Sequence, residues 1–158
     1  MPSQNVYIDT DILMFYFDKK KVDERRVARS SIEKVVRSLR ENSEIKVKIC
    51  QVVLGELMLH FCKGKCEFDE MKKLFERLNV GSSDMPSASS KVLKCANEIM
   101  ESQHRIKPND ALIVAQVLKD SSATWLLTTD EKLIGNRVIE EKMQALGHRF
   151  NIDSSFHR

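Results

Sequence analysis

Two acidic residues follow apolar runs of the kind that form central strands. Asp9 comes directly after residues 6–8, and Asp130 follows residues 124–127 after two threonines. Ligands of open α/β sheets bind at the carboxyl ends of the strands, so both carboxylates are expected at that end of the sheet. An acid in this position is a candidate for chemistry.

Two further acids are expected on inward faces of helices. Asp110 opens one helical pattern and Glu56 lies inside another. The apolar residues that share their faces are Ile113, Val114 and Val117 for Asp110, and Val52, Val53 and Leu59 for Glu56. A buried ionised carboxylate is costly unless a cation or strong hydrogen bonds compensate it.

The four acids together favour a metal site. Clustered carboxylates repel one another and hold protons tightly unless a divalent cation is present. Carboxylate oxygens and water are the ligands that Mg²⁺ or Mn²⁺ prefers. Taken singly, each acid also fits a structural role, because Asp often caps a helix or interacts with the helix dipole.

Asp11 adds a carboxylate two residues after Asp9. Two roles fit it: a further metal or water ligand, or the cap of the helix that is expected to start near residue 12. Thr10 is the other candidate for that cap.

Strands that alternate with helices would position these acids. The patterns predict strands at residues 6–8, 44–50, 124–127 and 148–152. They predict helices at residues 12–17, 24–40, 52–61, 68–78, 86–102, 110–118 and 136–146, the last stopped by Gly147. This order predicts an α/β fold with a parallel sheet covered on both faces.

Length and composition predict one soluble domain over residues 1–158, with residues 153–158 as a frayed tail. The net charge of +3 is compatible with a polyanionic partner but does not require one. No apolar run approaches the ~20 residues of a membrane span, and the first residues lack the features of a signal peptide. A cytoplasmic protein that does not contact a membrane is therefore expected.

The cysteines are expected to be free thiols in a reducing compartment. His60, Cys62 and Cys66 invite a zinc interpretation, but their spacing fits no standard pattern and a fourth ligand is missing.

Four short motifs carry a resemblance to a known family. They are VYIDTDIL at residues 6–13, VVLGEL at 52–57, KPNDALIVAQVL at 107–118 and LLTTD at 126–130. In this order and spacing they resemble the successive signatures of PIN domains. The resemblance implies a central parallel sheet of about five strands between helices and metal-dependent cleavage of RNA. In size the chain is similar to toxin ribonucleases of the VapC type.

The resemblance also implies roles for the acids. Asp9, Glu56 and Asp110 match the first three acids of the family and would hold one Mg²⁺ or Mn²⁺. Asp130 matches the fourth and would ligate a second ion or orient water, while Thr128 matches a small hydroxyl residue that often precedes it. The ion would lower the pKa of water and neutralise charge as the phosphodiester is attacked; one-ion and two-ion versions both remain open.

The chain departs from the pattern at two places. The position of Asp11 is often Asn or Ser in the family. Residues 63–90 carry no signature, although the resemblance implies that this region shapes the RNA groove. Basic residues occur at 19–21, 25–26, 46, 48, 63, 65 and 72–73, where they would line a phosphate groove or form a solvated surface. Residues 15–17 are aromatic and would stack bases, join a dimer contact or pack in the core.

The resemblance leaves several functions open. A toxin would have an antitoxin protein as partner, and PIN proteins of this size often form homodimers. An RNA-processing nuclease without a toxin role, or a module that binds RNA or protein without cutting, would fit the same motifs. A haloacid-dehalogenase-like phosphatase also begins with an Asp-x-Asp motif, as at Asp9 and Asp11, but the paired acids it needs late in the chain are missing.

Overall fold

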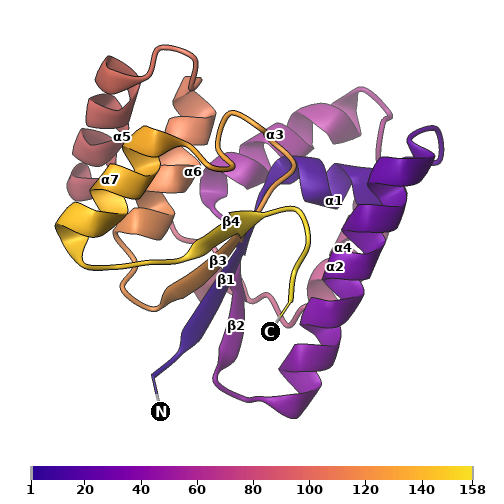
Figure 1. Ribbon diagram of the computed structural model, residues 1–158. Helices are drawn as coiled ribbons and strands as arrows, with labels where there is room; N and C mark the ends of the chain where they lie inside the picture. Colours follow the sequence, from indigo (N-terminus) through magenta and orange to yellow (C-terminus); the bar gives the residue numbers. More distant parts are fainter. Residues whose placement is uncertain (1, 158) are drawn as a thin grey trace.

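The computed structural model describes residues 2–157, which form strands and helices in alternation (Figure 1). The strands are β1 (Gln4–Ile8), β2 (Ile45–Lys48), β3 (Ala123–Leu127) and β4 (Asn151–Asp153). The helices are α1 (Thr10–Phe17), α2 (Val22–Glu41), α3 (Gln51–Cys62), α4 (Phe68–Arg77), α5 (Ser90–Ser102), α6 (Pro108–Leu118) and α7 (Arg137–Leu146), with a 3₁₀ turn at Ser82–Asp84. None of the helices in residues 2–157 is both long and apolar enough to cross a membrane.

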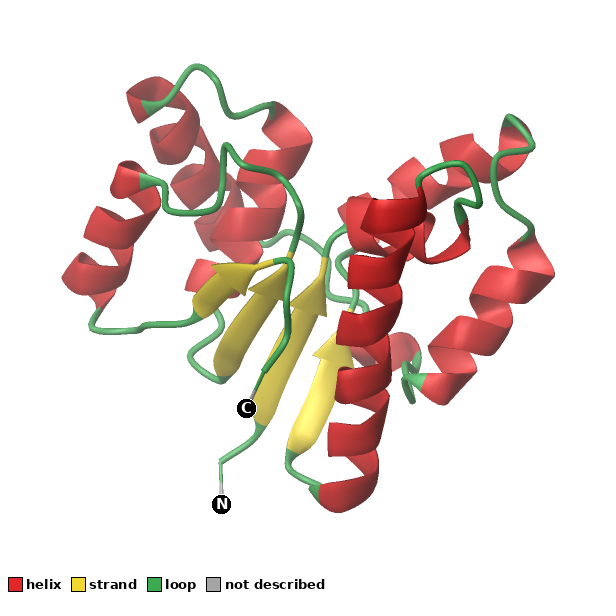
Figure 2. Cartoon of the chain, turned by 45° about the vertical axis from the view of Figure 1, so that its right-hand side comes forward, coloured by secondary structure: helices red, strands yellow, loops and turns green. Residues whose placement is uncertain are grey.

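The sheet is parallel throughout, with strand order β2-β1-β3-β4. In register, Val6 of β1 lies opposite Val47 of β2 and Trp125 of β3. Figures 1 and 2 show α5, α6 and α7 gathered on one side of the sheet, while the long helix α2 runs along the other. The strands therefore all point to one end of the molecule, where β1 and β3 end next to each other.

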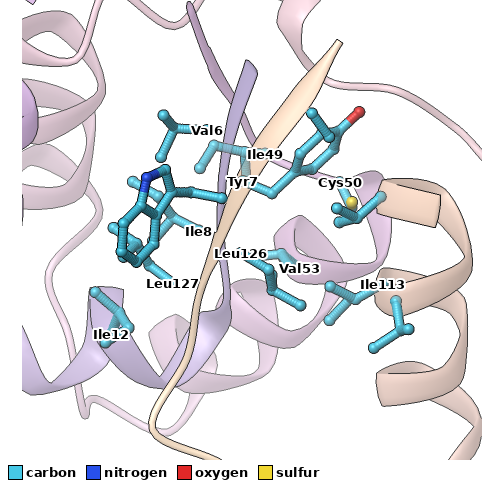
Figure 3. Packing of buried hydrophobic residues seen from close by; sticks show 14 of the residues in the cluster. Val6, Tyr7, Ile8, Ile12, Ile49, Cys50, Val53, Ile113, Leu126 and Leu127 are labelled. Atoms are coloured by element: carbon cyan, nitrogen blue, oxygen red, sulfur yellow. The ribbon is translucent and has the colours of Figure 1, made fainter. Parts of the chain in front are cut away.

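The strands in the middle of the sheet are buried on both faces, as expected of a parallel sheet between helices. Val6, Tyr7 and Ile8 are each at most 3% exposed, so neighbours on opposite faces of β1 are both in the core. The buried side chains form one hydrophobic cluster, part of which is shown in Figure 3. This packing fixes where the chain leaves β1 and β3.

The predicted α/β class with a parallel sheet between helices is confirmed, and the sheet has four strands within residues 2–157 where the resemblance implied about five. The chain after the 3₁₀ turn comes close to extending the sheet. Ile49 and Gln51 donate backbone hydrogen bonds to the carbonyls of Asp84 and Pro86, at 2.9 and 3.0 Å. These two bonds lie beyond the end of β2 and do not form a fifth strand.

Among the helix starts that differ from the prediction, those of α5 and α1 have a clear physical cause. Helix α5 begins at Ser90 behind the Ser89 cap rather than at Pro86, because the carbonyl of Pro86 is bound to the chain after β2. Helix α1 begins at Thr10, and its N-cap is Asp9, so neither Thr10 nor Asp11 is the cap. The sequence alone favours the later residues because the apolar run starts only at Ile12.

Residues 153–157 of the tail that was expected to fray contact the rest of the fold, and residue 158 lies outside the described residues. β4 covers Asn151–Asp153, later than the predicted strand. The hydroxyl of Ser31 on α2 donates to the carbonyl of Ser154 at 2.6 Å and accepts from the amide of Phe156 at 3.0 Å. The ring of Phe156 lies 5.1 Å from that of Trp125. The tail thus packs against Trp125 of β3, an inner strand of the sheet.

Candidate active site

Asp9 lies at the point where β1 becomes α1. Its side chain is 5% exposed, and both carboxylate oxygens accept hydrogen bonds. Oδ1 accepts from the amide of Thr10 at 2.7 Å, and Oδ2 accepts from the hydroxyl of Thr128 at 2.8 Å. Hydrogen bonds to the charged form favour ionisation, so they partly offset the cost of burial.

Thr128 lies at the end of β3 and is wholly buried. Besides donating to Asp9, its hydroxyl oxygen accepts a hydrogen bond from the amide of Asp130 at 3.1 Å. One hydroxyl thus joins the ends of the two central strands and sets the turn on which Asp130 stands.

Asp11 is in the first turn of α1 and binds the loop that follows β3. Its Oδ2 accepts hydrogen bonds from the amide of Thr129, at 2.9 Å, and from the Thr129 hydroxyl. Its Oδ1 accepts from the amide of Ile12 at 2.7 Å. Asp11 therefore joins α1 to this loop instead of capping the helix, and it faces the same region as Asp9.

Glu56 comes from α3, which packs against α1. Its Oε1 accepts a hydrogen bond from the hydroxyl of Thr10 at 2.7 Å. The consecutive residues Asp9 and Thr10 therefore connect Glu56 to the ends of both central strands.

Asp110 and Asp130 complete the set. Asp110 is half-buried in the first turn of α6, and its carboxylate has no hydrogen-bond partner among the described residues. The carboxylate of Asp130 accepts from the amide of Lys132 at 2.9 Å, within the loop after β3. Asp110 is thus the acid whose oxygens are most available to an added ligand.

The carboxylates are close enough to change one another's proton affinity. Burial, the charge of Asp11 and the charge of Asp110 raise the pKa of Asp9 to about 8, against the hydrogen bonds that lower it. Burial and the charges of Asp130 and Glu56 raise the pKa of Asp110 to about 6. All four acids singled out in the sequence therefore converge on one region.

The pKa of Asp11 is also raised, first by burial and then by the charge of Asp130, against hydrogen bonds from Thr129 and Ile12 that lower it. Five carboxylates therefore share this region. Among the described residues, the charge of Lys132 acts on them from nearby, because it lowers the pKa of Asp110. Repulsion of this kind is relieved by protonation or by a cation.

The site fits a hard divalent cation in donor chemistry and charge, since all candidate ligands are carboxylate oxygens. As the side chains stand, however, no three His, Cys, Asp or Glu residues within residues 2–157 are placed so that they could hold a metal ion. Asp9 and Asp11 have their oxygens in hydrogen bonds, whereas Asp110 does not. Side chains must therefore turn before three of them can share one ion. The same finding covers His60, Cys62 and Cys66, which form no such group.

Sequence reasoning missed Thr129. Its amide and hydroxyl both bind Asp11, so the two threonines before Asp130 each hold a different acid. The signal was present in the Thr-Thr-Asp motif, but only the threonine two residues before the acid was singled out.

The comparison with family models agrees with the motifs. A model of the family described as PIN domain matches residues 6–136. Among solved structures, the chain is similar to one in the crystal structure of VapBC2 from Rickettsia felis bound to a DNA fragment from their promoter. The identity is 15%, the match covers 97% of this chain and 99% of that chain, and the TM-score is 0.49. The search of curated proteins gave no match. Because the family model covers most of the chain and all four predicted acids, this protein belongs to the PIN domain family.

Proposed function

We propose that this protein is an endoribonuclease that hydrolyses RNA phosphodiester bonds with Mg²⁺ or Mn²⁺. The observation that carries the proposal is the convergence of Asp9, Asp11, Glu56, Asp110 and Asp130 at the ends of β1 and β3, with raised pKa values at Asp9 and Asp110. PIN domains are typically nucleases, which supports the same reaction class.

Asp9, Glu56 and Asp110 would hold the first cation, and Asp130 would hold a second or orient water. When bound, the cation supplies positive charge at the scissile phosphate and makes water a stronger nucleophile. Asp11 is a possible further ligand. Thr10 and Thr128 are positioning residues, because their hydroxyls fix the carboxylates of Glu56 and Asp9.

The raised pKa values give this proposal a specific pH dependence. A carboxylate must lose its proton before it can ligate a cation. Protons therefore compete with the cation up to the pKa of Asp110, about 6, and that of Asp9, about 8. Cleavage is expected to rise with pH across this range and to fall when the divalent cation is chelated.

The test is Asp110→Asn, with Asp69→Asn as a matched control. Both residues lie in the first turn of a helix, but Asp69 is exposed on α4, away from the acids. Asp110→Asn, like Asp9→Asn, is expected to abolish cleavage of single-stranded RNA with the fold retained by circular dichroism. Asp69→Asn is expected to cleave normally. Wild-type cleavage by Asp110→Asn would overturn the assignment.

Further measurements distinguish the alternative functions from the proposed one. A PIN module that binds RNA or protein without cutting would show no thermal shift with Mg²⁺ or Mn²⁺. A phosphatase would release phosphate from a monoester and leave RNA intact. Either result would remove the nuclease proposal.

A narrower proposal is that the nuclease is the toxin of a toxin–antitoxin pair. It rests on the similarity in size and motifs to toxins of the VapC type, with an antitoxin protein and a second copy of the chain as partners. Induced expression is then expected to arrest growth of bacterial cells, and a small protein encoded upstream is expected to relieve the arrest. An RNA-processing enzyme would give neither effect. Sedimentation of the purified chain tests the homodimer.

A further inference from the structure

Basic residues from three separate segments line one cavity beside the C-terminal end of α1. The cavity has a volume of about 520 Å³ and is bounded by α1, the start of α2 and the connection between α3 and α4. Its cationic side chains are Lys19, Arg25, Arg29 and Lys65. In the sequence these were dispersed basic spots; the fold brings them together.

The cavity carries an excess of positive charge. Four cations face two carboxylates, those of Glu67 and Glu70. None of the four cations forms an ion pair with any residue in the range 2–157. By contrast, Arg26, the neighbour of Arg25, lies outside the cavity and pairs with Asp23 at 3.3 Å. Other cations of the described residues also lack an ion pair. These four are distinguished because they share one cavity, whose lining has a net charge of +2.

Arg25 supplies an independent sign of a missing acceptor. Its Nε atom is buried and has no hydrogen-bond partner among the described residues. A buried N–H group without an acceptor costs free energy, and guanidinium groups match the oxygens of phosphates and carboxylates particularly well. An anionic oxygen bound in the cavity would satisfy it.

Arg29 and Tyr16 give the cavity a fixed wall. The Nε of Arg29 donates to the carbonyl of Tyr16 at 2.9 Å, and its guanidinium carbon lies 4.8 Å from the centre of the Tyr16 ring. The Tyr16 hydroxyl in turn accepts from Arg77 at 2.9 Å. These contacts leave the terminal nitrogens of Arg29 held in place and able to donate.

The position of the cavity relates it to the acids. Helix α1 has its N-cap at Asp9 and ends at Phe17, which lines the cavity. Its eight residues span about 12 Å, so the acids lie at one end of this helix and the cations at the other. A single strand of a few nucleotides can reach over that distance. In Figure 1 the loop after α1 and the connection between α3 and α4 both lie at the upper right.

The geometry points to this cavity as a binding site for a backbone phosphate of single-stranded RNA, a few nucleotides away from the bond that is cleaved. The inference deepens the proposed ribonuclease function and rests on it for the identity of the polyanion. Arg25 and Lys65 are the central phosphate ligands, with Lys19 and Arg29 beside them.

The experiment measures RNA binding without cleavage. A fluorescently labelled oligouridine of about twelve nucleotides is titrated with protein in EDTA, and anisotropy gives the affinity at several salt concentrations. The test variant is Arg25→Gln/Lys65→Gln. The control is Arg26→Gln/Lys63→Gln, which removes the same number and type of charges from positions one and two residues away that do not line the cavity. Thermal melts of both variants establish that they fold.

The test variant is expected to bind at least about tenfold more weakly, because charge-assisted hydrogen bonds are lost. Its salt dependence should fall by about 0.7 in the slope of log affinity against log salt, because one phosphate is no longer neutralised. The control is expected to bind like the wild type. Equal weakening of both variants, or of neither, would overturn the inference.

Two further experiments distinguish a failure of this inference from a failure of the proposed function. Polyglutamate of the same length is used as a competitor; if it binds in an Arg25-dependent way and RNA does not, the cavity serves an acidic protein and the inference fails. Cleavage with Mg²⁺ is measured independently. If the wild type cleaves RNA and both variants bind RNA equally well, only the inference about the cavity is refuted. If the test variant alone loses binding but the wild type never cleaves, only the proposed nuclease function is refuted. Lys19→Gln against Lys20→Gln repeats the comparison with single variants.

Discussion

The hydroxyl of Thr128 donates a 2.8 Å hydrogen bond to the carboxylate of Asp9, and this bond joins the ends of the two central strands. Both groups are buried, so the carboxylate loses water and gains one strong donor in exchange. The same hydroxyl accepts from the amide of Asp130. Thr128 therefore affects both the proton affinity of one acid and the position of another.

Thr128→Val keeps the volume but removes this hydroxyl. We expect a loss of about 1–3 kcal/mol in the free energy of unfolding, because a buried carboxylate and a backbone amide each lose a partner. The pKa of Asp9 should rise further, since the bond that lowers it is gone. The pH of half-maximal cleavage should therefore move upward.

Urea denaturation and a pH–rate profile check both effects. Thr128→Ser, which restores the hydroxyl, should recover most of the stability and the profile. If Thr128→Val has the same pH–rate profile as the wild type, the hydrogen bond does not control the pKa of Asp9.

The raised pKa values also predict how stability changes with pH. In the folded protein Asp9 titrates near pH 8 and Asp110 near pH 6, whereas both have ordinary values near 3.8 when unfolded. At these two groups the folded state thus holds more protons than the unfolded state between these values, so their contribution to stability falls as pH rises from about 4 to about 8. His60, whose pKa is lowered by burial, contributes the opposite sign around its ordinary value of 6.5.

The prediction is tested by measuring melting temperatures in EDTA across this pH range for the wild type and for a variant without these two acids. The decline should be smaller in Asp9→Asn/Asp110→Asn, which keeps His60 but lacks the two raised carboxyls. Saturating Mg²⁺ should reduce the decline in the wild type, because only the deprotonated acids bind it. Equal slopes for the wild type and the variant in EDTA would contradict the assignment of these pKa values.

Much of the fold and the site could be predicted from local patterns. The ends of apolar strands located Asp9 and Asp130, and helical spacing located Asp110. These signals work because burial imposes the same period on the sequence that the element has in space. Of the face assigned to Glu56, Val53 is buried but Leu59 is exposed, so that part of the prediction is wrong.

The remaining features depend on contacts between distant segments. The cap of α1 is Asp9, one or two residues earlier than predicted, because the strand passes directly into the helix. Pro86 does not start α5, since its carbonyl binds Gln51. The gathering of Arg25 and Lys65 in one cavity likewise has no periodic signature.

Asp110→Asn is expected to stabilise the protein while it abolishes cleavage. The substitution removes a half-buried charge that is repelled by Asp130 and Glu56. Each kcal/mol gained would raise the melting temperature by roughly 2–4 °C for a domain of this size. The increase produced by Mg²⁺ in the wild type should be reduced or lost. Differential scanning calorimetry at pH 8 with and without Mg²⁺ measures both, and a less stable variant would speak against repulsion at this site.

The cysteines should differ sharply in reactivity. Cys62 is exposed, whereas burial and the charge of Asp9 raise the pKa of Cys50 to about 12. Burial also raises the pKa values of Cys66 and Cys95. Since the thiolate is the reactive form, a disulfide reagent at pH 8 should label one thiol rapidly and three slowly. Cys62→Ser should remove the rapid phase; a rapid phase that survives would point to opening of the core near another cysteine.

Ser31 is expected to hold the end of the chain on the sheet. Its hydroxyl bonds to the backbone at Ser154 and Phe156, so Ser31→Ala leaves two backbone groups without this partner and should cost about 1–3 kcal/mol. Release of Phe156 would expose Trp125, whose fluorescence should then shift to longer wavelength and become more accessible to acrylamide. Ser30→Ala, at the exposed neighbouring position, should change neither quantity. If Ser31→Ala lowers stability but leaves the tryptophan protected, the hydroxyl stabilises α2 without retaining the tail.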